Sequence, residues 1–292
     1  SLYESADSTG QVSLKDLFDK PDSLEGENNL NIDKLAFLIC RGGWPHAVGM
    51  REKIALAQAE DYYEAVIKSD INRADGVSKN PERVKRLLRS LARNQGAQIA
   101  NTMLKNDIVS NDTESLNEDT IASYLNALKK IFVIEDMPAW NPNLRSKTSI
   151  RSSDTRYFVD PSIAVSALGA GPQDLINDLN TMGLLFETLC VRDLRVYAEK
   201  IGGSVLHYRD KSGLECDTVI HLKNGRYGLA EIKLGGQKLI EEGAANLKAL
   251  SNKIDTSKML APSFLMIIIG VGEFAYKRED GIFIVPIGCL KD

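Results

Sequence analysis

The sequence contains few of the residues that build metal clusters or disulfide frameworks. Its 292 residues include four cysteines and three histidines, and no two cysteines have the C-x-x-C spacing of a zinc or redox site. Cys190 and Cys216 fall in apolar patterns, in which a buried free thiol is the expected state. Structural zinc and disulfide pairing are therefore not expected. Free thiols are typical of a reducing compartment, so we predict a cytoplasmic protein.

Long hydrophobic runs and an excess of positive charge are absent as well. The longest apolar stretch, residues 264–271, is far shorter than the roughly 20 residues that span a bilayer, and no signal peptide is recognisable. We therefore expect no membrane partner. The net charge of −4 argues against nucleic-acid binding over the whole surface and leaves only a local basic patch. The length is sufficient for two domains, each with its own core, and is compatible with an oligomer.

The first thirty residues differ in composition from the rest of the chain. They are polar and rich in Ser, Asp, Glu and Gly, and only residues 12–18 have the pattern of a short helix, which begins after Ser13. We expect residues 1–30 to be a linker or a loosely attached tail.

Residues 31–165 are expected to form a helical domain. Helical patterns at 32–70 are interrupted at Arg41-Gly42-Gly43-Trp44-Pro45, and Asn80-Pro81 begins a further helix. Another helix is expected at 96–105, and Asn117 can cap one at 118–130. Extended runs at 131–134 and 156–159 flank a polar loop at 141–155. Three helices followed by two strands around a polar loop is the order of a winged helix-turn-helix.

Basic side chains are concentrated in this domain. Between Lys79 and Lys105 there are seven Lys or Arg against one acid, Glu82. In a DNA-binding winged helix the wing contacts phosphates and the third helix enters the major groove. The alternative is a solvated charged face on a winged helix that contacts protein. The candidate nucleic-acid contacts are Arg86, Arg89, Arg93, Lys130, Lys147, Arg151 and, further along the chain, Arg209.

Residues 175–292 are expected to form an α/β domain, so that the whole chain is of the α+β or α/β class. A helix is predicted at 180–200, followed by strands at 204–209, 214–222 and 226–234, a helix at 236–251 and a strand at 263–271; short strands near 273–277 and 282–287 close the chain. The strand–helix–strand unit at 226–271 implies a parallel pair with a crossover. The other neighbours look like hairpins, so the sheet should be mixed.

Charged residues in this predicted sheet have the pattern of a phosphodiester-cleaving site. Glu231 and Lys233 are two residues apart in one strand and therefore point to the same face. Asp217 lies in the preceding strand. A carboxylate pair can hold Mg²⁺ or Mn²⁺, which activates water and offsets charge in the transition state, and a nearby lysine can stabilise that charge. We interpret Asp217 and Glu231 as metal ligands and Lys233 as a catalytic residue.

The hairpin between the two strands provides a test of this site. Asn224-Gly225 is a strong turn signal. If Lys223 paired with Arg226 across a two-residue turn, Asp217 would face Ile232, and Glu231 would lie on the other side of the sheet. A shared site therefore requires an irregularity, such as a three-residue loop with Gly225 left-handed, or a bulge.

Glu187 is a fourth candidate catalytic residue. On its predicted helix, Cys190, Val191 and Leu194 follow at the spacing of an apolar stripe, so that Glu187 faces the interior, where a carboxylate needs a partner or a cation. Each of the four residues also has a structural interpretation: an ion pair for E-x-K, turn chemistry for the Asp, and a salt bridge for the helix Glu.

Together these residues resemble a known superfamily. Glu187 on a helix, Tyr208-Arg209-Asp210-Lys211-Ser212-Gly213 before Asp217, and Glu231-Ile232-Lys233 are similar to the pattern of PD-(D/E)xK nucleases. The resemblance implies a restriction-endonuclease-like fold for 175–292 and a metal site at Asp217 and Glu231. Cys216 stands where the superfamily pattern has a proline, a position that varies in the superfamily.

More narrowly, nearly the whole chain resembles the C-terminal region of prokaryotic AAA-type P-loop ATPases. The similar segments are Ser1-Leu2-Tyr3-Glu4-Ser5, Arg41-Gly42-Gly43-Trp44-Pro45 and Tyr157-Phe158-Val159-Asp160-Pro161. The resemblance implies that a missing ATP-binding domain precedes the chain and that residues 1–30 belong to its tail. The chain itself contains no G-x-x-x-x-G-K-[ST] loop and so has no P-loop site.

We therefore expect a Mg²⁺-dependent nuclease-like module that processes DNA with an ATPase. Two alternatives stay open: a non-catalytic nucleic-acid-binding module, and a protein-interaction or regulatory region of the ATPase. The intact set of Glu187, Asp217, Glu231 and Lys233 favours the first expectation, and the net charge of −4 favours the third.

Overall fold

The structure is a computed structural model that describes residues 1–20, 24–109, 117–142 and 154–292. The chain divides into two compact units, which are described separately below. Unit 1 contains residues 1–35, 137–154 and 190–292, and unit 2 contains residues 36–136 and 155–189.

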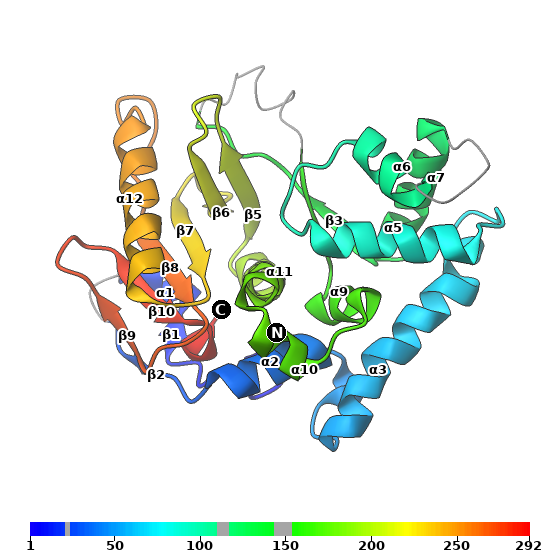
Figure 1. Cartoon of the computed structure of the whole chain (residues 1–292). Coiled ribbons are helices and arrows are strands. Elements are labelled where there is room, and N and C mark those ends of the chain that lie inside the picture. The colour runs from blue at the N-terminus through cyan, green and yellow to red at the C-terminus, as the bar shows by residue number, and fades with distance from the viewer. Residues whose placement is uncertain (21–23, 110–116, 143–153) are drawn as a thin grey trace. The chain divides into compact units, whose positions relative to one another are not determined.

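A seven-stranded sheet forms the centre of unit 1 (Figure 1). The strand pairs β7/β8 and β8/β10 are parallel and the other neighbours are antiparallel, so the predicted mixed sheet is confirmed. In spatial order the strands are β2 (Gly26–Glu27), β9 (Phe274–Lys277), β10 (Phe283–Pro286), β8 (Leu265–Ile269), β7 (Tyr227–Lys233), β6 (Glu215–Leu222) and β5 (Gly203–Arg209).

Helix α12 (Gln237–Lys253) connects β7 to the parallel strand β8, as the strand–helix–strand pattern predicts. It lies alongside these strands (Figure 1). Its apolar residues Ala244, Leu247 and Leu250 share a buried cluster with Leu229 of β7 and Ile267 of β8. Because alternate residues of a strand face opposite ways, every second residue of β7, counted from Leu229, faces this helix.

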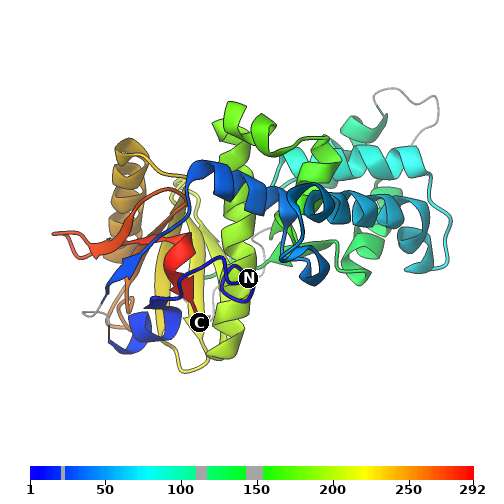
Figure 2. The same ribbon diagram turned by 90° about the horizontal axis from the view of Figure 1, so that it is seen from below.

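Residues 1–20 and 24–30 are not the loosely attached tail that their composition predicts. Strand β1 (Val12–Ser13) pairs in parallel with β11 (Leu290–Lys291), helix α1 (Leu14–Asp19) follows, and β2 joins the main sheet. Leu2 and Leu14 are buried. The two ends of the chain consequently lie close together in unit 1 (Figure 2). The prediction from composition was wrong here, because a few buried apolar residues are enough to pack an otherwise polar segment against the rest of unit 1.

Unit 2 consists mainly of helices. They are α2 (Ile32–Arg41, which begins in unit 1), α3 (Glu52–Ala65), α4 (Ile71–Arg73), α5 (Pro81–Arg93), α6 (Asn101–Val109), α7 (Glu118–Lys130), α9 (Pro161–Leu168), α10 (Pro172–Asn177) and the first part of α11 (Leu179–Lys200). Strands β3 (Ile134–Met137) and β4 (Thr155–Phe158) form a two-stranded sheet.

Two predicted helix starts in unit 2 are confirmed by their caps. Asn80 accepts hydrogen bonds from the backbone N–H groups of Glu82 and Arg83, and Asn117 accepts one from Thr120. Such side-chain acceptors satisfy amide groups that have no partner inside the helix.

Two other predicted boundaries in unit 2 are displaced. The helix expected at 96–105 runs instead from Asn101 to Val109. The extended run expected at 131–134 becomes strand only at Ile134, because α7 ends at Lys130 with Ile131 as its C-cap and Phe132 adopts a left-handed backbone with φ of 54°. Residues 143–153 of the predicted polar loop lie outside the described residues.

Two segments of the ATPase resemblance meet in unit 2. Asp160 caps α9 by accepting the Ser162 N–H, and its other carboxylate oxygen accepts the Gly43 N–H at 2.8 Å. The Trp44 indole donates to the Ser162 hydroxyl at 2.9 Å. The Gly-Gly-Trp turn and the Asp-Pro helix start therefore form one hydrogen-bonded corner, which explains their residue types.

Gly228 of β7 provides a test of how tightly unit 1 is packed. A Cβ at this position would lie 2.1 Å from Cζ of Phe264, whose ring packs edge-on against Phe18. We predict that Gly228→Ala lowers the free energy of unfolding by about 1–3 kcal/mol, measured by chemical denaturation, because the buried ring must shift. Gly183→Ala in α11, where no atom lies within 4 Å of the new Cβ, is the control. Equal stability of the two variants would contradict this packing.

Candidate functional site

The turn between β6 and β7 has the irregularity that a shared site requires. The Leu222 N–H donates to the Arg226 carbonyl at 2.8 Å, and His221 pairs with Tyr227, so the loop contains the three residues 223–225. Gly225 has a φ of 85°, in the left-handed region that glycine favours. Continued from the Thr218–Ala230 pair, this register sets Asp217 opposite Glu231. The predicted irregularity is confirmed, and of the two forms considered it is the three-residue loop with Gly225 left-handed.

Asp217, Glu231 and Lys233 are brought together on one face of β6 and β7. Lys233 Nζ lies 2.7 Å from Glu231 Oε2 and 3.1 Å from Asp217 Oδ2. Asp217 Oδ2 also accepts the backbone N–H of Ile232 at 2.8 Å. One ammonium group therefore bridges two carboxylates, and a main-chain amide orients the more exposed of them.

The carboxylate of Glu231 is held in a strongly perturbed environment. Glu231 is only 1% exposed. Burial first, and then the neighbouring Asp217 carboxylate, raise the pKa of Glu231 to about 8, whereas Lys233 lowers this pKa. Burial by itself would lower the pKa of Lys233, but the two carboxylates outweigh it and raise that pKa. Such a pair of carboxylates favours any additional positive charge that reaches it.

Helix α12 covers this cluster at a glycine. Glu231 and Lys233 face the same side of β7 as Leu229, which packs under α12. A Cβ at Gly243 would lie 3.4 Å from the Glu231 Cβ and 3.6 Å from the Lys233 Cε. The absence of a side chain at Gly243 lets the helix approach the site closely and leaves room beside the lysine stem. An isolated glycine within a helical pattern was the available signal for this contact.

Glu187, the fourth predicted site residue, belongs to unit 2. There it accepts a hydrogen bond of 2.6 Å from the hydroxyl of Tyr157, which is buried in β4. Gly96 packs against both groups, because a Cβ there would lie 2.5 Å from Glu187 Oε1. The structure thus assembles three of the four predicted residues in unit 1 and gives Glu187 a tyrosine partner in its own unit. A tyrosine far away in sequence carries no signal that would predict this pair.

Asp210 organises the hairpin that leads into β6. Its carboxylate accepts the backbone N–H groups of Ser212 and Leu214 at 2.7 and 3.2 Å, and it forms an ion pair with Lys253 at the end of α12. Lys253 first, and then the Ser212 hydroxyl, hold the pKa of Asp210 well below its usual value. Our prediction treated Asp210 only as part of a motif, although an Asp two residues before a Ser-Gly pair is typical of a side-chain-stabilised turn.

The basic side chains expected on unit 2 divide into two groups. Arg89 and Arg93 on α5 and Lys130 at the end of α7 are exposed. Arg86, in contrast, donates to the Ile108 carbonyl at 2.9 Å and so joins α5 to α6. Arg86 therefore contributes to packing, which the helical-face pattern does not reveal.

The remaining basic candidates lie elsewhere. Arg209, in unit 1, is exposed, and its Nε lies 3.2 Å from Oε1 of Glu215 across the β5–β6 hairpin. Lys147 and Arg151 lie outside the described residues.

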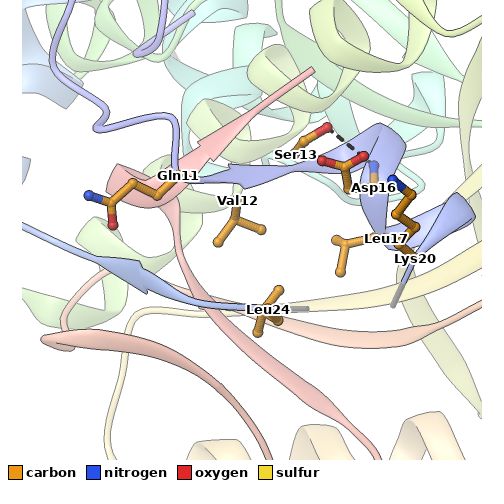
Figure 3. Close-up of a pocket in the computed structure, with 7 residues that line it drawn as sticks. All are labelled: Gln11, Val12, Ser13, Asp16, Leu17, Lys20 and Leu24. Atoms are coloured by element: carbon orange, nitrogen blue, oxygen red, sulfur yellow. Dashed lines mark hydrogen bonds between the residues drawn. The ribbon is translucent and has the colours of Figure 1, made fainter. Parts of the chain in front are cut away.

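Among the residues that the structure describes, no group of three or more His, Cys, Asp or Glu is arranged to hold a metal ion. No helix in the described part of the chain is both long enough and apolar enough to cross a membrane. A pocket beside α1 has a volume of about 30 Å³, far below the size of a site for a drug-sized ligand (Figure 3). Its lining residues are Gln11, Val12, Ser13, Asp16, Leu17, Lys20 and Leu24.

Comparisons with known proteins assign the two parts of the chain to different domain models. Residues 32–174 match a domain of unknown function (DUF8612). Residues 182–290 match a second domain of unknown function (DUF4143), which is found in AAA-ATPase-associated proteins. No curated protein and no solved structure matches the chain. For residues 182–290, this match agrees with the predicted resemblance to AAA-ATPase-associated proteins.

The close approach of α12 to the site leads to a paired prediction at Gly243. Gly243→Ala should raise the free energy of unfolding by about 0.5–1 kcal/mol, because alanine loses less backbone entropy in a helix and its Cβ meets only ordinary contacts. Gly243→Val should lower it by about 1–3 kcal/mol, since its branches would press on Glu231 and Lys233. Denaturant midpoints measure both, and a valine variant as stable as the alanine variant would contradict the contact.

The pKa of Asp210 leads to a prediction about pH. A lowered pKa means that the charged form stabilises the fold above the usual value of 3.8, and that this contribution is lost as the pH falls below it. Asp210→Asn should therefore lower the melting temperature at pH 7, and the difference from wild type should narrow below about pH 4. Lys253→Met should reproduce part of the loss at pH 7. Thermal unfolding at several pH values measures this, and a pH-independent difference would exclude the ionic contribution.

Proposed function

We propose that this chain carries a Mg²⁺- or Mn²⁺-dependent, nuclease-like module that processes DNA together with a AAA-type ATPase. The observation that carries the proposal is the three-residue turn that sets Asp217 opposite Glu231, with Lys233 across both carboxylates. Two carboxylates and one ammonium group on adjacent strands are the residue types that phosphodiester hydrolysis needs.

The order of elements supports a finer description of both units. In unit 1, a helix, three antiparallel strands, a crossover helix and a parallel strand follow one another as α11, β5, β6, β7, α12 and β8. This order is compatible with a restriction-endonuclease-like fold. In unit 2, α5, α6 and α7 followed by β3 and β4 are compatible with a winged helix.

The donor set suits a hard divalent cation. Mg²⁺ keeps several of its waters and is commonly bound through one or two carboxylates together with substrate phosphates, so a pair of carboxylates is sufficient. Asp217 and Glu231 would hold the cation. When bound, it would activate a water molecule and offset charge that develops on the phosphate.

The protein's own groups would position the reactants. The Ile232 N–H fixes the direction of the Asp217 carboxylate, and burial under α12 restrains Glu231. Lys233, with 21% of its side chain exposed, can donate to a phosphate oxygen or to the attacking water. The exposed Arg89, Arg93 and Lys130 can contact the phosphate backbone and contribute salt-dependent affinity.

Cleavage of single- and double-stranded DNA with Mg²⁺ or Mn²⁺ tests the proposal. We predict that Asp217→Asn and Glu231→Gln each reduce the cleavage rate by at least about 100-fold, since each removes a ligand of the cation that stabilises the transition state. Glu242→Gln, on the exposed side of α12, is the matched control and should cleave like wild type.

The outcomes separate the three expected functions. Cleavage that survives in both site variants, or that is absent from wild type with every substrate, excludes the catalytic proposal. DNA binding without cleavage, weakened by salt and by an Arg89→Ala, Arg93→Ala double variant, would select the nucleic-acid-binding module. Absence of both activities would select the protein-interaction or regulatory module of an ATPase.

A further inference from the structure

We propose that Lys233 is an exchangeable internal counter-ion, whose ammonium group occupies the carboxylate pair until a divalent cation displaces it. This inference rests on the proposed function, because it assigns the cation to Asp217 and Glu231. It adds a regulatory step: loading of the cation would release a positive charge for use on a phosphate.

The ammonium group of Lys233 contacts the carboxylate oxygens that would bind a divalent cation. Its Nζ lies 2.7 Å from Glu231 Oε2 and 3.1 Å from Asp217 Oδ2. Glu231 has 2% of its side-chain surface exposed, so its carboxylate has little access to water as an alternative partner. The ammonium group of Lys233 is therefore the positive charge that bridges the two carboxylates.

The charges explain why lysine and a divalent cation should exclude each other. The two carboxylates carry a charge of about −2 when both are ionised, and lysine compensates only half of it. A divalent cation compensates all of it. An ammonium group that stayed between the same oxygens would then repel the cation at short range in a poorly solvated site, where such repulsion is strong.

The surroundings of Lys233 allow its head group to move. The lysine stem passes Gly243, which presents no side chain, and 21% of the lysine side chain is already exposed. Lysine carries a compact charge on a flexible stem, whereas a guanidinium group would be held by the two carboxylates in a planar, bidentate fashion. A released ammonium group would find its next partner in the phosphate oxygens of a nucleic acid.

Cation affinity tests the exchange directly. Mn²⁺ and Mg²⁺ binding to the whole chain would be measured by isothermal titration calorimetry, without DNA. We predict that Lys233→Met binds Mn²⁺ at least about tenfold more tightly than wild type, because the competing charge is gone. Lys233→Arg should bind no more tightly than wild type. Lys238→Met, an exposed lysine on α12, is the control and should leave the affinity unchanged.

A second measurement does not depend on the stability of the methionine variant. In wild-type protein the side-chain NMR signal of Lys233, assigned by its loss in Lys233→Arg, should shift on addition of Mg²⁺. In an Asp217→Asn, Glu231→Gln double variant it should not shift.

The results distinguish this inference from the function on which it rests. Equal or weaker Mn²⁺ affinity in Lys233→Met, or a wild-type lysine signal that Mg²⁺ leaves in place, overturns the counter-ion while cation-dependent cleavage stands. Absence of Mn²⁺ binding in wild type and variants overturns both. Tighter binding in Lys233→Met together with the Mg²⁺-dependent shift supports the exchange.

Discussion

The register between β6 and β7 is the constraint on which the candidate site depends. Side chains alternate between the faces of a sheet, so a shift of one residue would send Asp217 and Glu231 to opposite sides. The loop at residues 223–225 prevents this, because Gly225 adopts a left-handed backbone that permits three residues where Asn-Gly turns usually have two. The meeting of the two carboxylates on one face of the sheet follows from this local choice.

Once the carboxylates share a face, the rest of unit 1 determines how they behave. The sheet and α12 bury Glu231, and Gly243 presents no side chain beside the stem of Lys233. Burial raises the pKa of the glutamate, and the lysine opposes that effect. The cluster therefore combines two carboxylates, one of them deeply buried, with a partly exposed lysine ammonium group beside both, and this arrangement is the physical basis of both proposals.

In unit 2, two predicted site residues and one residue of the ATPase-like segments have structural partners. Arg86 joins two helices through the Ile108 carbonyl, Glu187 binds the Tyr157 hydroxyl, and Asp160 ties the Gly-Gly-Trp turn to a helix start. Arg89, Arg93 and Lys130 are exposed instead. Any nucleic-acid contact of this unit would therefore rest on fewer basic residues than the sequence suggests, in keeping with the acidic composition of the whole chain.

Local patterns in the sequence were sufficient for six of the seven strands of the sheet, all except β2, and for the parallel crossover pair. They were also sufficient for the caps at Asn80 and Asn117 and for the shared face of Glu231 and Lys233. Each of these depends mainly on residues close together in the sequence. Their spacing along a helix or strand fixes the directions in which their side chains point. The turn at residues 223–225 was predicted only in part. The sequence showed that an irregularity was needed, but not which one.

Only the tertiary structure decided which distant groups meet. It paired β1 and β2 of the polar N-terminal segment with C-terminal strands, gave Glu187 and Arg86 their partners, and set Gly243 over the lysine stem. These contacts join residues far apart in the chain, and no periodicity connects them. The sequence by itself determined which charged residues share a strand face, and the packing of the chain decided how deeply they are buried and which groups oppose their charge.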